Sequence, residues 1–283
     1  MKRIYNWYNN LSKQVRDSII VSTTVVGLIS TILSILGISL GDWKDSNIWV
    51  RIAVVLVSFV VLCVLVYVII GRIFRKSIDL MIRQTLVYIS CGDIFETYGW
   101  KVIGCDTHFD TRVDDIIISK KSLHGQLVLE HGEKEEIQRL VKSEAERLGI
   151  QKNSNGLYDF PLGTIIRYDS SVDNQTYLML AMTELNAEYE AHTNMAKFEL
   201  MLMKMWKEIS RVYASNNVVL PILGTGILRF DDGPKEREAL LRCMLCTLNS
   251  SGVSLNAKVK IMLYGDTQNV PLYEYKNMFH MIL

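Results

Sequence analysis

Two long apolar stretches near the start of the chain restrict its fold more than any other feature of the sequence. Residues 18–40 contain no charged side chain, and residues 48–70 contain one, Arg51. As α-helices, the stretches would each be about 35 Å long, which exceeds the roughly 30 Å hydrocarbon core of a bilayer. The sequence therefore predicts a hairpin of two transmembrane helices, 18–40 and 48–70.

The distribution of Lys and Arg around these stretches predicts their orientation. The cations before the first stretch are Lys2, Arg3, Lys13 and Arg16, and those after the second are Arg72, Arg75, Lys76 and Arg83. The intervening segment has only Lys44. Because cytoplasmic loops carry the excess of Lys and Arg, both termini are expected in the cytoplasm. We therefore expect a cytoplasmic N-terminal segment at 1–17, a basic connector at 71–84 and a cytoplasmic domain at 85–283.

Small residues recur along the first stretch at spacings of three and four. They are Thr23, Gly27, Ser30, Ser34, Gly37 and Gly41. This spacing places them in one stripe along a helix, and small residues let helix backbones approach closely in lipid. The stripe serves either the packing of the two helices in one hairpin or an oligomer interface.

The remaining composition excludes several classes of function. A net charge of +1 gives no support for nucleic acid as a partner. Five cysteines are present, but Cys243 and Cys246 fall in a helical pattern, which favours core packing over redox or zinc chemistry. The histidines lack the spacing of metal ligands, so we expect no metal site.

From residue 85 onward, short apolar runs alternate with amphipathic helical patterns. The runs that predict strands are 86–89, 100–104, 164–168, 177–182, 218–223 and 259–264, and the helical patterns are 133–148, 194–214 and 236–248. Residues 122–130 indicate a turn that leads into apolar residues. The alternation predicts an α/β domain with a mixed or parallel sheet covered by helices. Ligands of such sheets bind at the carboxyl ends of the strands.

Two segments at predicted strand ends have chemistry that suits a nucleotide. In Gly92-Asp93-Ile94, the carboxylate is able to accept a hydrogen bond from an adenine amino group, although Gly-Asp is also common in plain turns. In Gly224-Thr225-Gly226, the two glycines allow backbone N–H groups to form an anion-binding nest for a diphosphate. The segment is neither a P-loop nor the G-x-G-x-x-G motif of a dinucleotide fold.

The order of these segments, in an α/β domain of this size, resembles the macro domain, a family that binds ADP-ribose and its derivatives. The resemblance implies that Asp93 contacts adenine, that the later loop holds the diphosphate and distal ribose, and that a middle loop contacts phosphate. The ligand-binding residues implied in this way are Gly92, Asp93, Ile94, His124, Gly125, Gln126, Leu223, Gly224, Thr225, Gly226, Ile227, Leu228, Arg229 and Phe230. Arg229 either pairs with a phosphate or is a solvated loop residue.

Three longer segments point to a particular branch of the macro-domain family. They are residues 118–125, 160–164 and 220–230. Behind two apolar stretches, they resemble the transmembrane–macro domain effectors of Thoeris anti-phage defence, with a ThsA-like macro domain, over nearly the whole chain. The resemblance implies a multi-pass protein of the bacterial inner membrane, in contact with membrane lipid. It implies that a TIR-domain protein uses NAD to make an ADP-ribose-derived messenger, histidine-ADP-ribose in this branch. Messenger binding would trigger homo-oligomerisation, membrane disruption and death of the infected cell (abortive infection).

One departure from the macro-domain pattern concerns residues 104–109. Macro domains that hydrolyse ADP-ribose bonds usually carry Asn after the second strand, and this stretch has none. We therefore expect a binding protein without a cofactor, and not an enzyme. Asp106 and His108 are instead expected to face the distal end of the ligand, where a carboxylate suits a cationic group. The alternatives are a membrane-anchored ADP-ribosyl hydrolase, with His108 as a general base, and a passive ADP-ribose reader.

Overall fold

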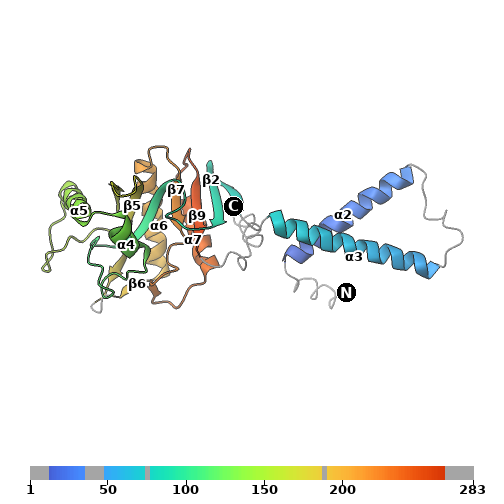
Figure 1. Cartoon of the computed structure of the whole chain (residues 1–283), viewed down its shortest axis with the longest axis horizontal. Helices are drawn as coiled ribbons and strands as arrows, with labels where there is room; N and C mark the ends of the chain where they lie inside the picture. The colour runs from blue at the N-terminus through green and yellow to red at the C-terminus, as the bar shows by residue number, and fades with distance from the viewer. Residues whose placement is uncertain (1–12, 36–47, 74–76, 187–189, 265–283) are drawn as a thin grey trace. The chain divides into compact units, whose positions relative to one another are not determined.

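The computed structural model describes residues 13–35, 48–73, 77–186 and 190–264, which form two compact units (Figure 1). Helices α2 (Lys13–Ile35) and α3 (Ile48–Ile73) belong to the first unit. The second unit begins at Ser77 and contains a sheet with its helices. Most of the expected N-terminal segment lies outside the described residues, as do the turn between the apolar stretches and the chain after Tyr264.

Helices α2 and α3 contact each other within the first unit. Ser18 and Ser22 of α2 are buried, whereas Thr23, Gly27 and Ser30 of the predicted small-residue stripe are exposed. A Cβ atom added at Gly27 would meet no atom within 4 Å. The described part of the stripe therefore lies away from the buried face of α2.

The predicted membrane localisation is wrong on the evidence of the described helices. None of the helices in the described ranges is both long enough and apolar enough to cross a membrane. Helix α2 carries three charged residues in its first turns. Two arginines, Arg51 and Arg72, lie within α3. The expected inner-membrane, multi-pass arrangement with both termini in the cytoplasm is corrected accordingly.

The second unit alternates strands and helices. Its strands are β1 (Ser77–Ile82), β2 (Thr85–Cys91), β3 (Trp100–Asp106), β4 (Ile165–Asp169), β5 (Thr176–Leu185), β6 (Ala191–Thr193), β7 (Val218–Pro221), β8 (Arg229–Phe230) and β9 (Val259–Leu263). Its helices are α4 (Leu123–Gln126), the π-helical turn η2 (Leu127–His131), α5 (Lys134–Leu148), α6 (Met195–Val212) and α7 (Arg237–Ser250). Strand β1 lies inside the segment expected to be a connector. Ile78, Leu80 and Ile82 are buried and alternate with exposed residues, which is the period of a strand covered on one face.

The strands form one mixed sheet in the order β1-β2-β9-β7-β3-β5-β6-β8, and β4 also pairs with β5. Strands β2, β9, β7, β3 and β5 are parallel neighbours, whereas β1 and β4 run antiparallel to their partners. Strand β6 is antiparallel to β5 and parallel to β8. The predicted mixed α/β sheet is therefore confirmed. Because the central strands are parallel, their carboxyl ends lie along the same edge of the sheet.

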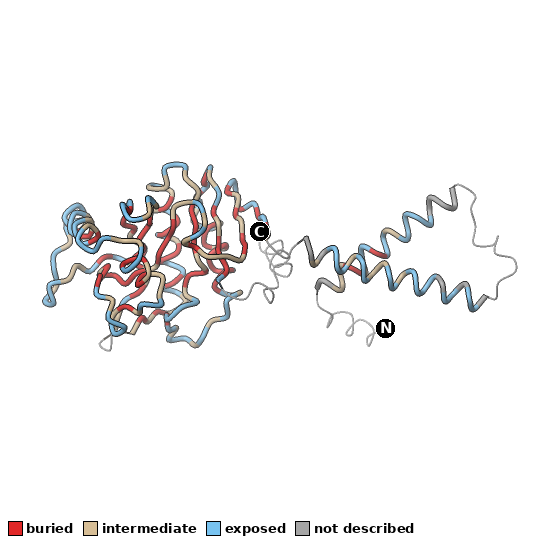
Figure 2. The backbone as a smooth tube through the Cα atoms, viewed as in Figure 1, coloured by how far each residue is buried: buried red, intermediate tan, exposed pale blue. Residues whose placement is uncertain are grey.

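Apolar residues cover the sheet on both faces, and the buried residues follow the central strands (Figure 2). On one side, Ile137 of α5 and Leu127 of η2 join a core that includes Ile103 and Met179 of the strands. The helices α6 and α7 contact each other, and the indole Nε1–H of Trp206 donates to Thr247 Oγ1 at 3.2 Å. Met201, Met205 and Trp206 of α6 are fully buried, as their helical spacing predicts for a core face.

Candidate functional site

The carboxyl edge of the parallel strands carries the loops in which sequence analysis placed a site. Loop 92–99 follows β2, loop 107–122 follows β3, and loop 222–228 follows β7. Strand β9 separates β2 from β7, and β7 is the neighbour of β3. The Gly92 N–H donates to Leu263 O at 3.1 Å, which ties the first loop to the end of β9.

Asp93 is fixed by bonds within its own loop. Its Oδ1 accepts the Phe95 N–H at 2.8 Å, and its carbonyl oxygen accepts the Thr97 hydroxyl at 2.7 Å. Within the described residues, Oδ2 has no hydrogen-bond donor. Ile94 is buried in the core, and a Cβ atom at Gly92 would lie 2.8 Å from Met262 Cε. The loop therefore holds one carboxylate oxygen and presents the other.

The glycine-rich loop after β7 is a tight turn whose two ends are buried. Gly224 has φ +85°, a backbone conformation that residues with a side chain rarely adopt. The Thr225 hydroxyl donates to Ile222 O at 2.8 Å. Leu223 and Leu228 are buried at the two ends of the turn. Between them Thr225, Gly226 and Ile227 are exposed. The structure thus presents the middle of the predicted diphosphate loop at the surface.

The two residues that follow this loop have partners in the protein. Arg229 Nη1 lies 2.6 Å from Glu190 Oε1, an ion pair that the sequence did not predict. The Phe230 ring packs edge-on against Phe198 of α6, with 5.5 Å between ring centroids, and Lys235 Nζ lies 6.0 Å from its centroid. Both side chains connect the loop to neighbouring elements.

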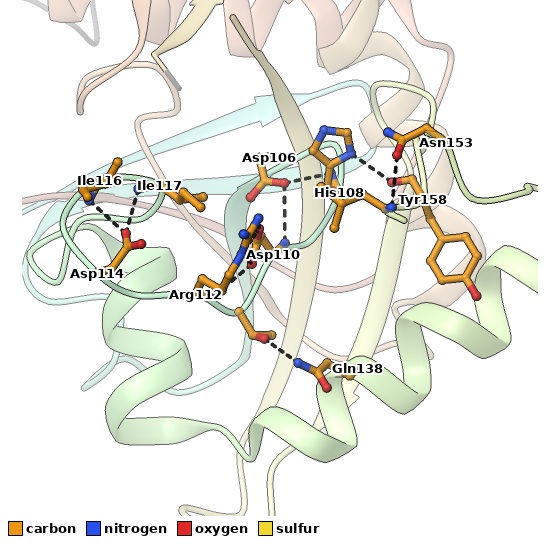
Figure 3. Close-up of polar contacts among 12 residues, drawn as sticks. Asp106, His108, Asp110, Arg112, Asp114, Ile116, Ile117, Gln138, Asn153 and Tyr158 are labelled. Atoms are coloured by element: carbon orange, nitrogen blue, oxygen red, sulfur yellow. Dashed lines mark hydrogen bonds and ion pairs between the residues drawn. The ribbon is translucent and has the colours of Figure 1, made fainter. Parts of the chain in front are cut away.

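Asp106 closes its own turn at the end of β3 (Figure 3). Its Oδ1 accepts the N–H of His108 at 2.8 Å and that of Asp110 at 3.5 Å, and the side chain is buried. Asp110 is held in turn by Arg112, whose Nε and Nη2 lie 2.9 and 2.5 Å from Oδ2. Burial alone would raise the pKa of Asp110, but the Arg112 side chain and backbone hold it below its usual value. These carboxylates therefore shape the loop.

His108 anchors the same loop to the segment at 152–159 (Figure 3). Its Nδ1 lies 3.0 Å from Tyr158 O and 2.9 Å from Asp159 Oδ1, both of which are acceptors, so this nitrogen carries the hydrogen. From the other side, Gln138 Nε2 of α5 donates to Thr111 Oγ1 at 2.8 Å. Sequence analysis missed these anchors because they join residues that are far apart in the chain.

The three predicted residues of α4 pack loop 107–122. His124 is buried, and its Nδ1 lies 3.9 Å from Asp106 Oδ2; burial lowers the pKa of His124, and the nearby Asp106 carboxylate opposes this effect. A Cβ atom at Gly125 would overlap the Ser119 carbonyl group. Gln126 Nε2 donates to Lys121 O at 3.1 Å. The structure thus brings His124 to Asp106, two residues that the sequence placed in separate loops.

The described residues hold no group of three or more His, Cys, Asp or Glu side chains placed for a metal ion. The thiol of Cys243 is buried in α7, and burial raises its pKa to about 12. A thiol with so high a pKa stays protonated at neutral pH, which makes it a poor nucleophile.

A mixed sheet that carries an acidic loop after β2 and a glycine-rich loop after β7 defines a domain of the macro type. The model of the family described as "Thoeris protein ThsA, Macro domain" matches residues 87–264, and the chain belongs to this family. The Thoeris protein ThsA of Bacillus amyloliquefaciens (strain Y2) is 28% identical over 274 residues, which cover 92% of this chain and 88% of that protein. The predicted ThsA-like macro domain is therefore confirmed.

Among solved structures, the chain is similar to the macrodomain of Oceanobacillus iheyensis. The form with ADP has a TM-score of 0.49 and 14% identity, and the match covers 74% of this chain and 98% of that chain. A variant with ADPR has a TM-score of 0.49 and 16% identity, with 74% and 100% covered.

Proposed function

We propose that this protein is a non-enzymatic effector of Thoeris anti-phage defence whose macro domain binds an ADP-ribose-derived messenger, histidine-ADP-ribose. The observation that carries the proposal is the Asp93 carboxylate, which is held through Oδ1 and presents Oδ2 at the end of β2. An acceptor in this position suits the amino group of adenine, which donates two hydrogens. In this proposal Asp93 therefore selects the base of the ligand.

The second support for the proposal is the spacing of the two loops. Strands β2 and β7 are separated by β9 alone, which places the ends of the two outer strands about 10 Å apart at the usual strand spacing. An adenosine diphosphate that lies along the strand ends, with its base at Asp93, would bring its diphosphate to the exposed turn at Thr225 and Gly226. The distal ribose would then lie towards β3.

The loop after β3 supports binding over hydrolysis. A hydrolase needs a polar group that positions water beside the ribose, and the side chains of Asp106 and His108 have partners within the protein. The buried His124 faces the same carboxylate. In the proposed function, these residues hold the shape of the loop at the distal end of the ligand.

The messenger in this proposal comes from a TIR-domain partner protein, and its binding favours a homo-oligomer. A ligand shifts an equilibrium only if it binds one state more tightly, so the assembled form must have the higher affinity.

Isothermal titration calorimetry on the full chain tests the proposal, with histidine-ADP-ribose and ADP-ribose as ligands. We expect Asp93→Ala to weaken binding of both ligands about tenfold or more, because a charge-assisted hydrogen bond contributes about 1.5–3 kcal/mol. A matched control is Glu135→Gln, which removes an exposed carboxylate from the first turn of α5. Failure of the parent protein to bind either ligand would overturn the proposal.

A further inference from the structure

An aromatic stack supports the loop that carries Asp93. The Phe95 ring lies parallel to the imidazole ring of His131, with 4.3 Å between centroids and 12° between the planes. Both rings also contact Tyr177, with 6.3 and 6.0 Å between centroids. Phe95 belongs to the loop after β2, whereas His131 ends the π-helical turn η2 and Tyr177 lies in β5. The stack thus joins the loop to two elements of the core.

The plane of the His131 ring is fixed by Asp173. His131 Nδ1 lies 2.9 Å from Asp173 Oδ2, and because a carboxylate only accepts, this nitrogen carries the hydrogen. Asp173 also accepts the Tyr177 hydroxyl at 2.5 Å and the Gln175 N–H at 3.0 Å. Burial would raise the pKa of Asp173, but these hydrogen bonds outweigh it and hold the pKa below its usual value. An ionised Asp173 therefore keeps the imidazole in one orientation.

The backbone of the Asp93 loop transmits the position of this stack to the carboxylate. The N–H that fixes Asp93 Oδ1 is that of Phe95, the residue whose ring lies on His131. A shift of the Phe95 ring moves its backbone, and the backbone N–H sets the direction in which the carboxylate points. Only Ile94 lies between Asp93 and Phe95 in the sequence, so the coupling is short and local.

We propose that Phe95 and His131 are positioning residues that aim Asp93 Oδ2 at the 6-amino group of adenine. The inference rests on the proposed function, because it assumes that Asp93 reads the base. It assigns a role in specificity to an aromatic cluster that joins the Asp93 loop to η2 and β5. Loss of the stack would leave a carboxylate that is present but no longer aimed, and the preference for adenine would fall.

The test compares dissociation constants of the full chain for ADP-ribose and for inosine diphosphate ribose. Inosine carries an oxygen in place of the adenine amino group, so the ratio of the two constants measures how well Asp93 is aimed. Aromatic pairs contribute about 0.5–1.5 kcal/mol, which converts to a factor of about 2 to 13 in a binding constant. We expect His131→Ala to reduce the parent's preference for ADP-ribose by a factor in this range, and Phe95→Leu to do the same.

Two further variants separate positioning from general loss of structure. His131→Phe restores a stacked ring without the bond to Asp173, and we expect it to recover most of the preference. In the background of Asp93→Ala, the change at His131 should no longer alter the ratio, because residues that act through one carboxylate are not additive. Since the ratio comes from two ligands on the same sample, an inactive fraction cancels.

The possible outcomes distinguish the inference from the function on which it rests. If the parent binds neither ligand, the proposed function and the inference both fail. If the parent prefers ADP-ribose and His131→Ala keeps the full preference, the proposed function stands and the inference is overturned. If His131→Ala weakens the binding of both ligands by the same factor, the inference is also overturned, because that result shows that the stack has only a structural role.

Discussion

Gly125 allows a severe test of the packing of loop 107–122 against α4. An ideal Cβ atom at this position would overlap the Ser119 carbonyl oxygen and would lie 3.0 Å from the carbonyl carbon and 3.1 Å from Lys120 Cα. All three atoms belong to the backbone, so no side chain is able to rotate away. Ala at residue 125 therefore requires the loop or the helix to move.

The expected cost follows from two opposing effects. Overpacking against rigid neighbours destabilises a fold by about 3 kcal/mol at the upper end of its usual range. Ala in place of Gly in a helix stabilises by about 1 kcal/mol. The difference predicts that Gly125→Ala lowers the free energy of unfolding by about 2 kcal/mol, which corresponds to a decrease in Tm of about 4–8 °C for a domain of this size.

Differential scanning calorimetry of the full chain measures this effect, with Gly226→Ala as the matched control. A Cβ atom at Gly226 would meet no atom within 4 Å, and Gly226 is not among the glycines with positive φ. We expect the Tm of the control to stay within about 1–2 °C of the parent, since surface changes usually have small effects. Equal Tm values for the two variants would refute the packing described for Gly125.

Three further predictions concern Asp173, Lys101 and His108. Folding lowers the pKa of Asp173, so its contribution to stability is complete above about pH 5 and is lost as the pH falls through the folded-state pKa. In urea unfolding, the Asp173→Asn variant should therefore lose less stability than the parent between about pH 5 and pH 3. Burial lowers the pKa of Lys101, so the unfolded chain binds more protons than the folded chain near the usual Lys pKa. The parent should therefore gain stability between about pH 9 and pH 11, and the Lys101→Met variant should lack this gain. His108→Ala removes the bond to Tyr158 O, and we expect faster amide hydrogen exchange at residues 107–111 with unchanged exchange in α5; equal exchange in both proteins would contradict the anchoring role.

The sequence predicts the strand-end loops well because their signals are local. An apolar run followed by Gly92-Asp93 or Gly224-Thr225 identifies both a strand and the turn that ends it, and the alternation of strands with helices places the two turns on one edge. Strand β1 was missed because its period of two was overlooked among the basic residues 71–84. Residues 122–130 indicate a turn that leads into apolar residues, whereas in the structure the Ser122 hydroxyl accepts the Gly125 N–H at 3.0 Å and begins a helix.

The arrangement of loop 107–122 lay beyond sequence reasoning for a different reason. Its conformation depends on contacts with distant residues, such as His108 with Tyr158 and Thr111 with Gln138. No local pattern specifies such pairs, because each partner is an ordinary polar residue in its own segment. Asp106 and His108 were therefore identified by their place after a strand, while the direction of their side chains required the structure.

The aspartates along the carboxyl edge differ in their hydrogen-bond donors and in their burial, and the proposed function assigns them different roles. A carboxylate offers about four acceptor positions, so the donors around it decide what remains for a ligand. Asp93 has one backbone donor, on Oδ1. Asp106 has two backbone donors and faces His124, and Asp110 has a two-pronged bond from Arg112. If the proposed function holds, replacing a residue of loop 107–122 with Asn would not by itself create a hydrolase, because the neighbouring carboxylates would still be bonded within the loop. In the proposed function, Asp93 is the carboxylate of this group that reads the ligand, through Oδ2.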